Sequence, residues 1–235
     1  YGFAFYQVCS STFSSEVLIW GKITMFSSIL FAISYAHLSL IIIDEKITLI
    51  DSVKHYCIDE MLDRIKSIVD PSKIDYLVCN HVEMDHSGAL PKLKELAPNA
   101  EIICSPNGEK NLLAHYKQNW KFKVVKSGDS VSIGKRSLKF VLTPMVHWPD
   151  NMVTYCPEDK ILYSNDAFGQ HLSSSQRFDD EFALDIIIEE AKKYYANIVL
   201  PYGNQVKKAL EDLTGIDISI IAPSFVIGFI CSMSI

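Results

Sequence analysis

The segment from His81 to His86 carries two histidines, a glutamate and an aspartate within six residues, directly after the apolar run Tyr76–Cys79. An apolar run of this length that ends in polar residues predicts a buried β-strand leading into a loop. Two imidazoles and two carboxylates this close cost free energy on burial unless a cation binds them. Nitrogen and oxygen donors without a thiolate in the loop favour iron, manganese or zinc over a structural zinc site.

Two further potential ligands follow predicted strands elsewhere in the chain. His147 comes shortly after the predicted strand Ser137–Leu142, and Asp166 comes just after the predicted strand Ile161–Ser164. Loops at the ends of strands often converge on a single site. The sequence therefore predicts a metal centre to which three such loops contribute.

The apolar periodicity predicts the order of the remaining elements. Helices are expected at Ile58–Val69, Ala89–Leu96, Gly108–Tyr116, Phe182–Ala196 and Gln205–Leu213. Further strands are expected at Leu38–Ile43, Ile47–Ile50, Glu101–Cys104, Phe122–Val125, Val131–Ile133, Val153–Cys156 and Ile218–Ala222. Strands that alternate with helices, then hairpins, then helices again predict an α+β fold in which two sheets pack face to face with helices outside, an αββα four-layer sandwich.

Composition narrows the classes of function. A net charge of −6 and the absence of any Lys- or Arg-rich block argue against a nucleic-acid-binding surface. The six cysteines are scattered and form no C-x-x-C pair, which is typical of buried or free thiols in a reducing compartment. We therefore expect a cytoplasmic protein.

The amino-terminal region allows two interpretations. Residues Ile23–Ile43 form a run of 21 residues without a formal charge, which is long enough for a membrane-spanning helix. Six polar side chains in the run, and the turn Asp44–Lys46 that follows it, instead favour a hairpin of Leu38–Ile43 with Ile47–Ile50. A membrane span is therefore the less favoured alternative.

The motif H-x-E-x-D-H after a strand, followed by a later histidine and a later aspartate, resembles the metallo-β-lactamase superfamily. The hydrolases of that superfamily usually carry histidine at the third motif position, where this chain has Glu83. With Asn165–His171 and Ile221–Ser224, this change makes the chain closely similar to the flavodiiron proteins (A-type flavoproteins) over roughly Ile41–Ser224. The resemblance implies a metallo-β-lactamase-like diiron domain at 35–224, between atypical segments at 1–34 and 225–235.

The resemblance also implies a non-haem diiron site and its chemistry. One iron is expected at His81, Glu83 and His147, and the other at Asp85 with His86 as a ligand or near-ligand, with Asp166 as the bridge. In the family such a site reduces O2 to water or couples NO to N2O, with electrons that arrive through FMN. A rubredoxin or a reduced flavoprotein is the implied electron donor, and a homodimer or homotetramer the implied assembly.

Three side chains are predicted to surround the metals. Trp148 is expected to form an apolar wall that keeps the pocket dry and suited to small neutral gases. His171 is expected to orient a carboxylate or to contact substrate, with an ordinary surface position as the alternative. For Tyr202, a position that lines the pocket is the alternative to core packing, which is favoured.

Three departures from the family are expected to matter. Phe225 follows Ala222–Ser224 where the family has another histidine ligand for the second iron. The chain stops at Ile235, where the family continues into a flavodoxin-like domain, so direct FMN binding by this chain is not expected. Residues before about Tyr35 do not resemble the family's amino-terminal strands. A frameshifted, truncated or wrongly joined reading frame is our hypothesis for both ends.

Three alternatives to a diiron reductase remain open from the sequence. A diiron domain without a flavodoxin partner resembles oxygen-sensing domains that bind O2 without turnover. A metal-dependent hydrolase is the second alternative, against which Glu83 argues. The third is a non-functional fragment in which Phe225 leaves the second iron weakly held.

Overall fold

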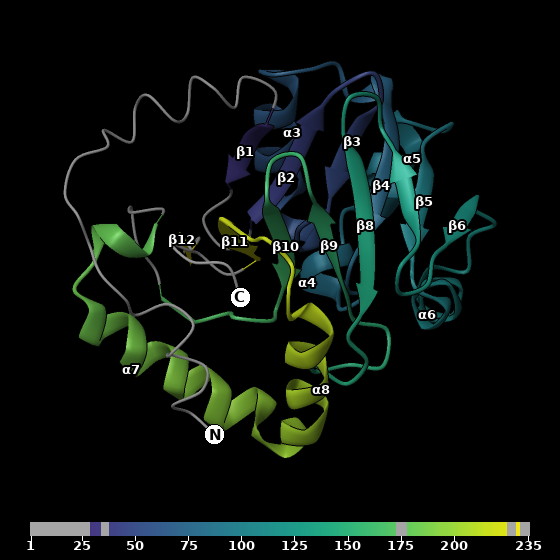
Figure 1. The fold of residues 1–235 in the computed structure, drawn as a ribbon. Coiled ribbons are helices and arrows are strands. Elements are labelled where there is room, and N and C mark those ends of the chain that lie inside the picture. Colours follow the sequence, from purple (N-terminus) through teal and green to yellow (C-terminus); the bar gives the residue numbers. More distant parts are fainter. Residues whose placement is uncertain (1–28, 34–37, 173–177, 225–228, 231–235) are drawn as a thin grey trace.

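The computed structural model describes residues 29–33, 38–172, 178–224 and 229–230, which form two six-stranded β-sheets. The first sheet has the order β1 (Ile29–Ile33), β2 (Leu38–Ile43), β3 (Ile47–Ile50), β4 (Ile74–Cys79), β5 (Glu101–Cys104) and β6 (Phe122–Val124). The second sheet has the order β12 (Phe229–Ile230), β11 (Ile220–Pro223), β10 (Ile161–Asn165), β9 (Met152–Cys156), β8 (Ser137–Leu142) and β7 (Ser130–Ser132) (Figure 1).

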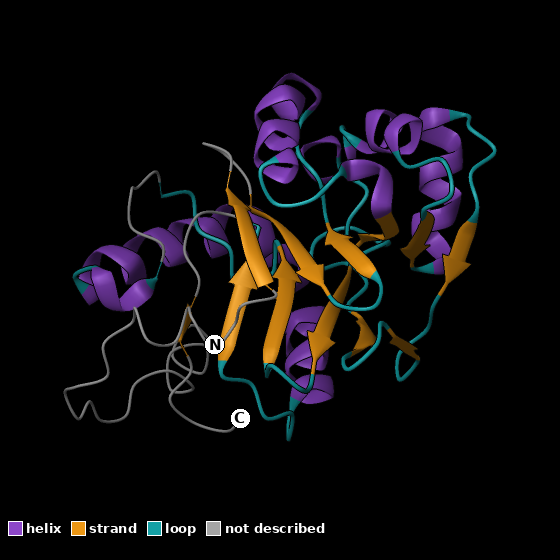
Figure 2. Ribbon diagram, turned by 90° about the horizontal axis from the view of Figure 1, so that it is seen from above, coloured by secondary structure: helices purple, strands orange, loops and turns teal. Residues whose placement is uncertain are grey.

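Helices lie on both sides of the paired sheets, as Figure 2 shows. The α-helices are α3 (Ile58–Lys66), α4 (Met84–Ser87), α5 (Leu90–Leu96), α6 (Pro106–Tyr116), α7 (Leu184–Tyr194) and α8 (Gly203–Leu213). Short 3-10 turns lie at η1 (His55–Cys57), η2 (Pro71–Lys73), η3 (Asp179–Glu181) and η5 (Leu200–Tyr202), and a π-helical turn, η4 (Tyr195–Val199), follows α7. The predicted α+β, four-layer arrangement is confirmed.

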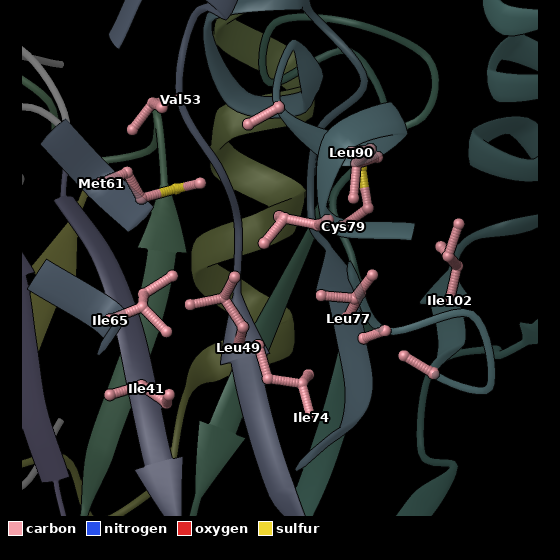
Figure 3. Packing of buried hydrophobic residues seen from close by; sticks show 14 of the residues in the cluster. Ile41, Leu49, Val53, Met61, Ile65, Ile74, Leu77, Cys79, Leu90 and Ile102 are labelled. Atoms are coloured by element: carbon pink, nitrogen blue, oxygen red, sulfur yellow. The ribbon is translucent and has the colours of Figure 1, made fainter. Parts of the chain in front are cut away.

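Alternate residues of the first sheet build two separate cores. Ile41 and Leu49 pack outward against α3, whereas their neighbours Ile42 and Ile50 face the second sheet. Because successive strand side chains point to opposite faces, a strand that is apolar at every position must be covered on both sides. Figure 3 shows the outer core, in which Met61 and other side chains of the helices cover this sheet.

The second sheet is covered in the same way. Phe140 and Tyr163 point inward and meet the first sheet. Val153 and Leu162 point outward and pack against Leu213 at the end of α8. Both sheets are therefore sandwiched, which accounts for strands β9 and β10 being buried along their whole length.

Strand direction brings the predicted ligand loops to one edge of the sandwich. In the first sheet, β3, β4, β5 and β6 are parallel. In the second sheet, β8 and β10 both run antiparallel to β9, so they point the same way. The backbone N–H of Met152 donates a hydrogen bond to the carbonyl of Asn80, with 3.0 Å between nitrogen and oxygen. This bond connects the start of β9 to the end of β4 across the two sheets.

A partly buried carboxylate joins the two sheets at another place, between two hairpin turns. Asp44, between β2 and β3, accepts hydrogen bonds from the backbone N–H groups of Lys135 and Arg136 in the β7–β8 turn. The guanidinium of Arg136 lies 3.3 Å from Asp44 and 2.6 Å from Asp159 of the β9–β10 turn. Gly134 has φ +129°, and a Cβ there would meet Asp44 at 2.5 Å, so this turn requires glycine.

The apolar amino-terminal run is extended where it is described. β1 pairs antiparallel with β2, and β2 pairs antiparallel with β3 in the predicted hairpin. Within the described ranges, no helix is both long and apolar enough to cross a membrane. β1 lies inside the segment 1–34, which the sequence analysis describes as atypical of the family. The domain boundaries at 34 and 224 stay predictions.

Several predicted elements differ at their ends. The helix predicted at Ile58–Val69 ends at Lys66. The helix predicted at Phe182–Ala196 is α-helical only over Leu184–Tyr194 and continues as a π turn, a form that periodicity does not distinguish. The helix predicted at Ala89–Leu96 begins at Leu90 and is preceded by a separate short helix, α4, inside the motif.

The cysteines that the structure describes fit the predicted free thiols. Cys79, Cys104 and Cys156 are buried, Cys57 is partly buried, and all four are free.

Candidate metal centre

Four of the six predicted metal ligands converge on one point. One donor atom from each of His81, Glu83, His147 and Asp166 lies within 4.8 Å of the others. His81 and Asp166 are buried, whereas Glu83 and His147 are partly exposed. This arrangement puts one side of the cluster in the protein interior and leaves the other side open to small molecules.

Each of these donors follows the end of a strand. His81 and Glu83 come after β4, His147 comes after β8, and Asp166 comes directly after β10. Because β4, β8 and β10 end at one edge of the sandwich, residues up to 85 positions apart in sequence become neighbours. The loop geometry therefore follows from strand direction, as the sequence predicts.

The carboxylate of Asp166 faces two different sets of donors. Its Oδ2 lies 3.2 Å from Nε2 of His147 and 3.5 Å from Nε2 of His81. Its Oδ1 lies 2.8 Å from Nε2 of His86. A carboxylate held between two donor sets in this way has the position of a bridge between two cations.

The second donor set lies on the short helix α4. Asp85 and His86 are neighbours there, with Asp85 Oδ1 3.6 Å from Nε2 of His86. In the part of the chain that the structure describes, Asp85 Oδ1 is buried and accepts no hydrogen bond. Buried carboxylate oxygens without hydrogen bonds are costly, so they fit a cation at this position.

The charges of the cluster are strongly coupled. Burial opposes protonation of His81, but hydrogen bonds with Asp150 and Glu83 outweigh it and raise the pKa of His81 to about 10. The hydrogen bond with His81 is also the main cause that lowers the pKa of Glu83. Burial acts to raise the pKa of Asp166, but the three neighbouring histidines hold it well below its usual range. Without a metal, the neighbouring carboxylates therefore favour the protonated forms of His81 and His86.

Asp150 is a site residue that the sequence reasoning missed. Its Oδ2 lies 3.0 Å from Nδ1 of His81 and accepts a 2.7 Å hydrogen bond from the backbone N–H of Val82. Asp150 follows His147 by three residues, and this proximity to a predicted ligand is the signal that could have indicated it.

A buried polar network, which the sequence reasoning also missed, lies at the strand ends where the ligand loops begin. Asp51, at the end of β3, accepts hydrogen bonds from the backbone and side chain of Asn80 and from the side chain of Asn165. Asn80 in turn accepts a 2.7 Å hydrogen bond from Thr154 of β9. This buried polar network links both sheets beneath the metal loops. The raised pKa of Asp51 comes chiefly from burial.

The predicted surrounding side chains lie at different distances from the cluster. Trp148 contacts His81 edge-to-face, with ring centroids 5.3 Å apart, in keeping with an apolar wall. His171 is exposed, and its ring packs edge-on against Tyr194 at 4.9 Å. Tyr202 is partly buried in η5. The roles predicted for these three residues stay predictions.

Tyr194 is a further residue that the sequence reasoning missed. It is buried at the end of α7, and burial together with the nearby carboxylates of Asp166, Glu83 and Asp85 raises the pKa of its phenol. It also lines an apolar cavity of about 40 Å³, whose walls include Val146 of the β8–β9 loop and side chains of η4 and α8. Helical periodicity indicates only that Tyr194 is internal, and nothing local indicates what it faces.

Phe225, which replaces the family's further histidine, lies outside the described residues. His55 and His115, which belong to no motif, are exposed and take no part in the cluster of four ligands.

Comparison with known families agrees with this geometry. A family model described as the ODP family beta lactamase matches residues 35–225. The chain belongs to this family. Within it, the resemblance to the diiron half of the flavodiiron proteins, drawn from the motifs, is confirmed.

Individual relatives of this ODP-family chain cover the same region. It is 47% identical over 187 residues to a protein of Moorella thermoacetica named nitric oxide reductase, a match that covers 78% of this chain and 47% of the relative. A solved flavodiiron protein from Giardia intestinalis has a TM-score of 0.83 at 33% identity, covering 88% of this chain and 55% of that chain. Rubredoxin oxygen:oxidoreductase from Desulfovibrio gigas has a TM-score of 0.81 at 41% identity, covering 83% of this chain and 49% of that chain. The chain thus spans about half the length of the relatives it matches.

Proposed function

We propose that this chain provides the diiron domain of an oxidoreductase that reduces O2 to water, NO to N2O, or both. His81, Glu83 and His147 would hold one iron, and Asp85 and His86 the other, with Asp166 between them. The observation that carries the proposal is the position of Asp166, whose two carboxylate oxygens face different donor sets. A single-metal hydrolase site would not need that arrangement.

The donor set fits iron. Three carboxylates and three imidazoles, without a thiolate, stabilise a higher oxidation state and still tolerate the lower one. The buried Asp85 Oδ1, which accepts no hydrogen bond from the described residues, is satisfied if a cation lies beside it. Glu83 supplies a hard, charged donor where hydrolases of the wider superfamily usually carry a neutral imidazole.

The residues around the cluster suit a small neutral substrate. Bound irons would supply the electrons that a diatomic gas needs for reduction. Trp148, whose ring contacts His81, and the buried Tyr194 would limit the access of water to the cluster. The apolar cavity beside Tyr194, at about 40 Å³, has room for a molecule the size of O2 or NO.

Names of relatives support the substrate class. The relatives include proteins named nitric oxide reductase, rubredoxin-oxygen oxidoreductase and anaerobic nitric oxide reductase flavorubredoxin. We infer that electrons reach this domain through FMN held outside it, from a rubredoxin or another reduced flavoprotein. The homodimer or homotetramer and the cytoplasmic location stay predictions.

Metal content tests the proposal. Protein purified without oxygen is expected to carry about two irons per chain and to develop an oxo-bridge charge-transfer absorption on exposure to air. Asp166→Ala removes the bridge, so iron content is expected to fall to about one per chain or less. His115→Ala changes an exposed histidine on α6 and is expected to keep both irons. Equal iron content in the two variants would exclude the bridged site.

A further inference from the structure

Asp150 is a buried carboxylate whose two oxygens are each held in place. It is 1% exposed, and its Oδ1 accepts a 3.0 Å hydrogen bond from the side-chain amide of Asn111 on α6. Its Oδ2 lies 3.0 Å from Nδ1 of His81 and accepts from the backbone N–H of Val82. The carboxylate therefore has little freedom to rotate, and one of its oxygens points at the imidazole.

The backbone that carries Asp150 is fixed as well. Its carbonyl accepts a 2.7 Å hydrogen bond from the hydroxyl of Ser105, the residue that caps α6. The side chain of Asn107, in the first turn of the same helix, donates to the carbonyl of Pro149 at 3.0 Å. The loop after β8 is thus anchored to the amino-terminal end of α6, and His81 is aligned against that anchor.

This contact determines which nitrogen of His81 is available to a metal. With Nδ1 directed to Asp150, the other nitrogen, Nε2, points into the cluster, 3.2 Å from Glu83 and 3.5 Å from Asp166. A carboxylate that accepts the proton of one ring nitrogen fixes the neutral tautomer and makes the other nitrogen a stronger donor.

We propose that Asp150 is a positioning residue of the metal centre, which orients His81 and increases its donor strength, and so sets the affinity and the reduction potential of the metal held by His81, Glu83 and His147. The inference rests on the proposed function only in requiring that a metal binds there. It adds a buried negative charge, outside the ligands themselves, which favours the more oxidised state of that metal.

The test uses the full chain, loaded with Co2+ under anaerobic conditions and followed by its visible spectrum. Asp150→Asn has the same shape but no charge. It is expected to weaken binding at one of the two sites by about 10- to 100-fold, with the other site much less affected. Asp75→Asn is the matched control, because Asp75 also accepts a backbone N–H, that of Ile47, but lies at a partly exposed ion pair away from the cluster. It is expected to bind Co2+ as the wild type does.

Two further measurements separate positioning from general stability. In the Co2+-loaded wild type, the ring N–H of His81 is expected to give a slowly exchanging, paramagnetically shifted proton resonance, and Asp150→Asn should move or broaden it. In iron-loaded protein, the same substitution is expected to make the reduction potential of one iron more positive.

Asn111→Ala keeps Asp150 but removes one of its restraints, so it is expected to weaken Co2+ binding at the same site by a smaller factor.

The outcomes distinguish this inference from the proposed function. Unchanged Co2+ affinity and an unmoved His81 resonance in Asp150→Asn would overturn the role of Asp150. If Asp150→Asn fails to fold, unchanged affinity in Asn111→Ala would overturn it instead. A wild type that binds a single Co2+, with affinity that Asp150→Asn lowers, would support Asp150 and contradict the two-metal site. A wild type that binds no metal would overturn both.

Discussion

At the scale of single residues, three polar side chains at the ends of strands hold the loops of the candidate metal centre in place. Asp51 and Asn80 directly follow β3 and β4, Asn165 is the last residue of β10, and each is buried. Asp51 and Asn165 have φ values of +54° and +55°, a conformation that costs about 1–3 kcal/mol for residues other than glycine. Their hydrogen bonds with one another offset that cost and direct the chain from the strands into the ligand loops.

Asp51→Ala is expected to lower the free energy of unfolding by about 3 kcal/mol. The substitution leaves the buried N–H groups of Asn80 and Asn165 without their acceptor, and each such loss costs about 1–3 kcal/mol. Urea unfolding followed by circular dichroism measures the change.

Asp63→Ala is the control. Asp63 is exposed on α3, and its ion pair with Lys66 is long, with 4.0 Å between the two charged atoms. Its effect should stay within about 0.5 kcal/mol. Similar losses in the two variants would mean that the network beneath the loops contributes no more than a surface ion pair.

The ligands and their supporting residues differ in how far the sequence indicates them. The sequence predicts the candidate ligands at His81–His86, His147 and Asp166 because each follows a recognisable strand, and the clustering of His81, Glu83, His147 and Asp166 then follows from strand direction. Asp150 contacts His81 from 69 positions away, and no local pattern encodes that distance. Asp51 was missed for the same reason, because a polar residue after a strand is equally typical of an ordinary turn.

At the scale of elements, the short helix α4 determines where Asp85 and His86 lie. It is only 4 residues long, so its position depends on packing and not on its own stability. Gly88 directly follows it and lies against the backbone after β3, where a Cβ would meet Met84 O at 2.5 Å and His55 N at 2.8 Å. Only a glycine lets α4 approach that closely.

Gly88→Ala is expected to displace α4, since neither backbone atom can yield as a flexible side chain would. We expect a loss of about 1–3 kcal/mol in the free energy of unfolding and weaker metal binding at Asp85 and His86. Thermal unfolding and Co2+ titration measure the two effects.

Gly203→Ala tests whether the loss is specific to Gly88. Gly203 begins α8, and the atom nearest to its added Cβ is Tyr195 Oη at 3.7 Å, an ordinary contact. Alanine has a higher helix propensity than glycine. The free energy of unfolding of this variant should therefore be unchanged or higher by up to about 1 kcal/mol. A metal affinity in Gly88→Ala equal to that of Gly203→Ala would show that α4 does not need this close approach.

At the scale of the whole molecule, the two sheets are joined both beneath the metal loops and at the Asp44 turn. The overall sandwich could be predicted, because strands that are apolar at every position require cover on both faces. The pairing of the β2–β3 turn with the β7–β8 turn could not, because Asp44 and Arg136 are 92 residues apart and each is typical of a surface turn.

The Asp44 contact predicts a pH dependence of stability. Burial acts to raise the pKa of Asp44, but hydrogen bonds from Glu45, Lys135 and Arg136 outweigh it and lower the pKa below 3.8. The unfolded chain therefore binds the proton first, so the contribution of Asp44 is complete above its unfolded pKa and is lost as pH falls through its folded pKa.

Asp44→Asn is thus expected to lower the free energy of unfolding by about 1–3 kcal/mol at pH 7. The difference from the wild type should shrink below about pH 4. Urea unfolding at several pH values checks this, with Asp212→Asn on the exposed face of α8 as the control, where the loss should stay within about 0.5 kcal/mol. A difference that is constant from pH 7 to pH 3 would contradict the assignment to an ionised Asp44.

The spread of the donors along the chain has a kinetic consequence. His81 follows the fourth strand of the first sheet, whereas Asp166 follows a strand of the second sheet that pairs with β11, which begins at Ile220. A chain emerging during synthesis, or a refolding intermediate with only one sheet formed, cannot yet present a complete ligand set. Metal uptake should therefore be a late event, slower than the appearance of secondary structure, and would report directly on the docking of the two sheets.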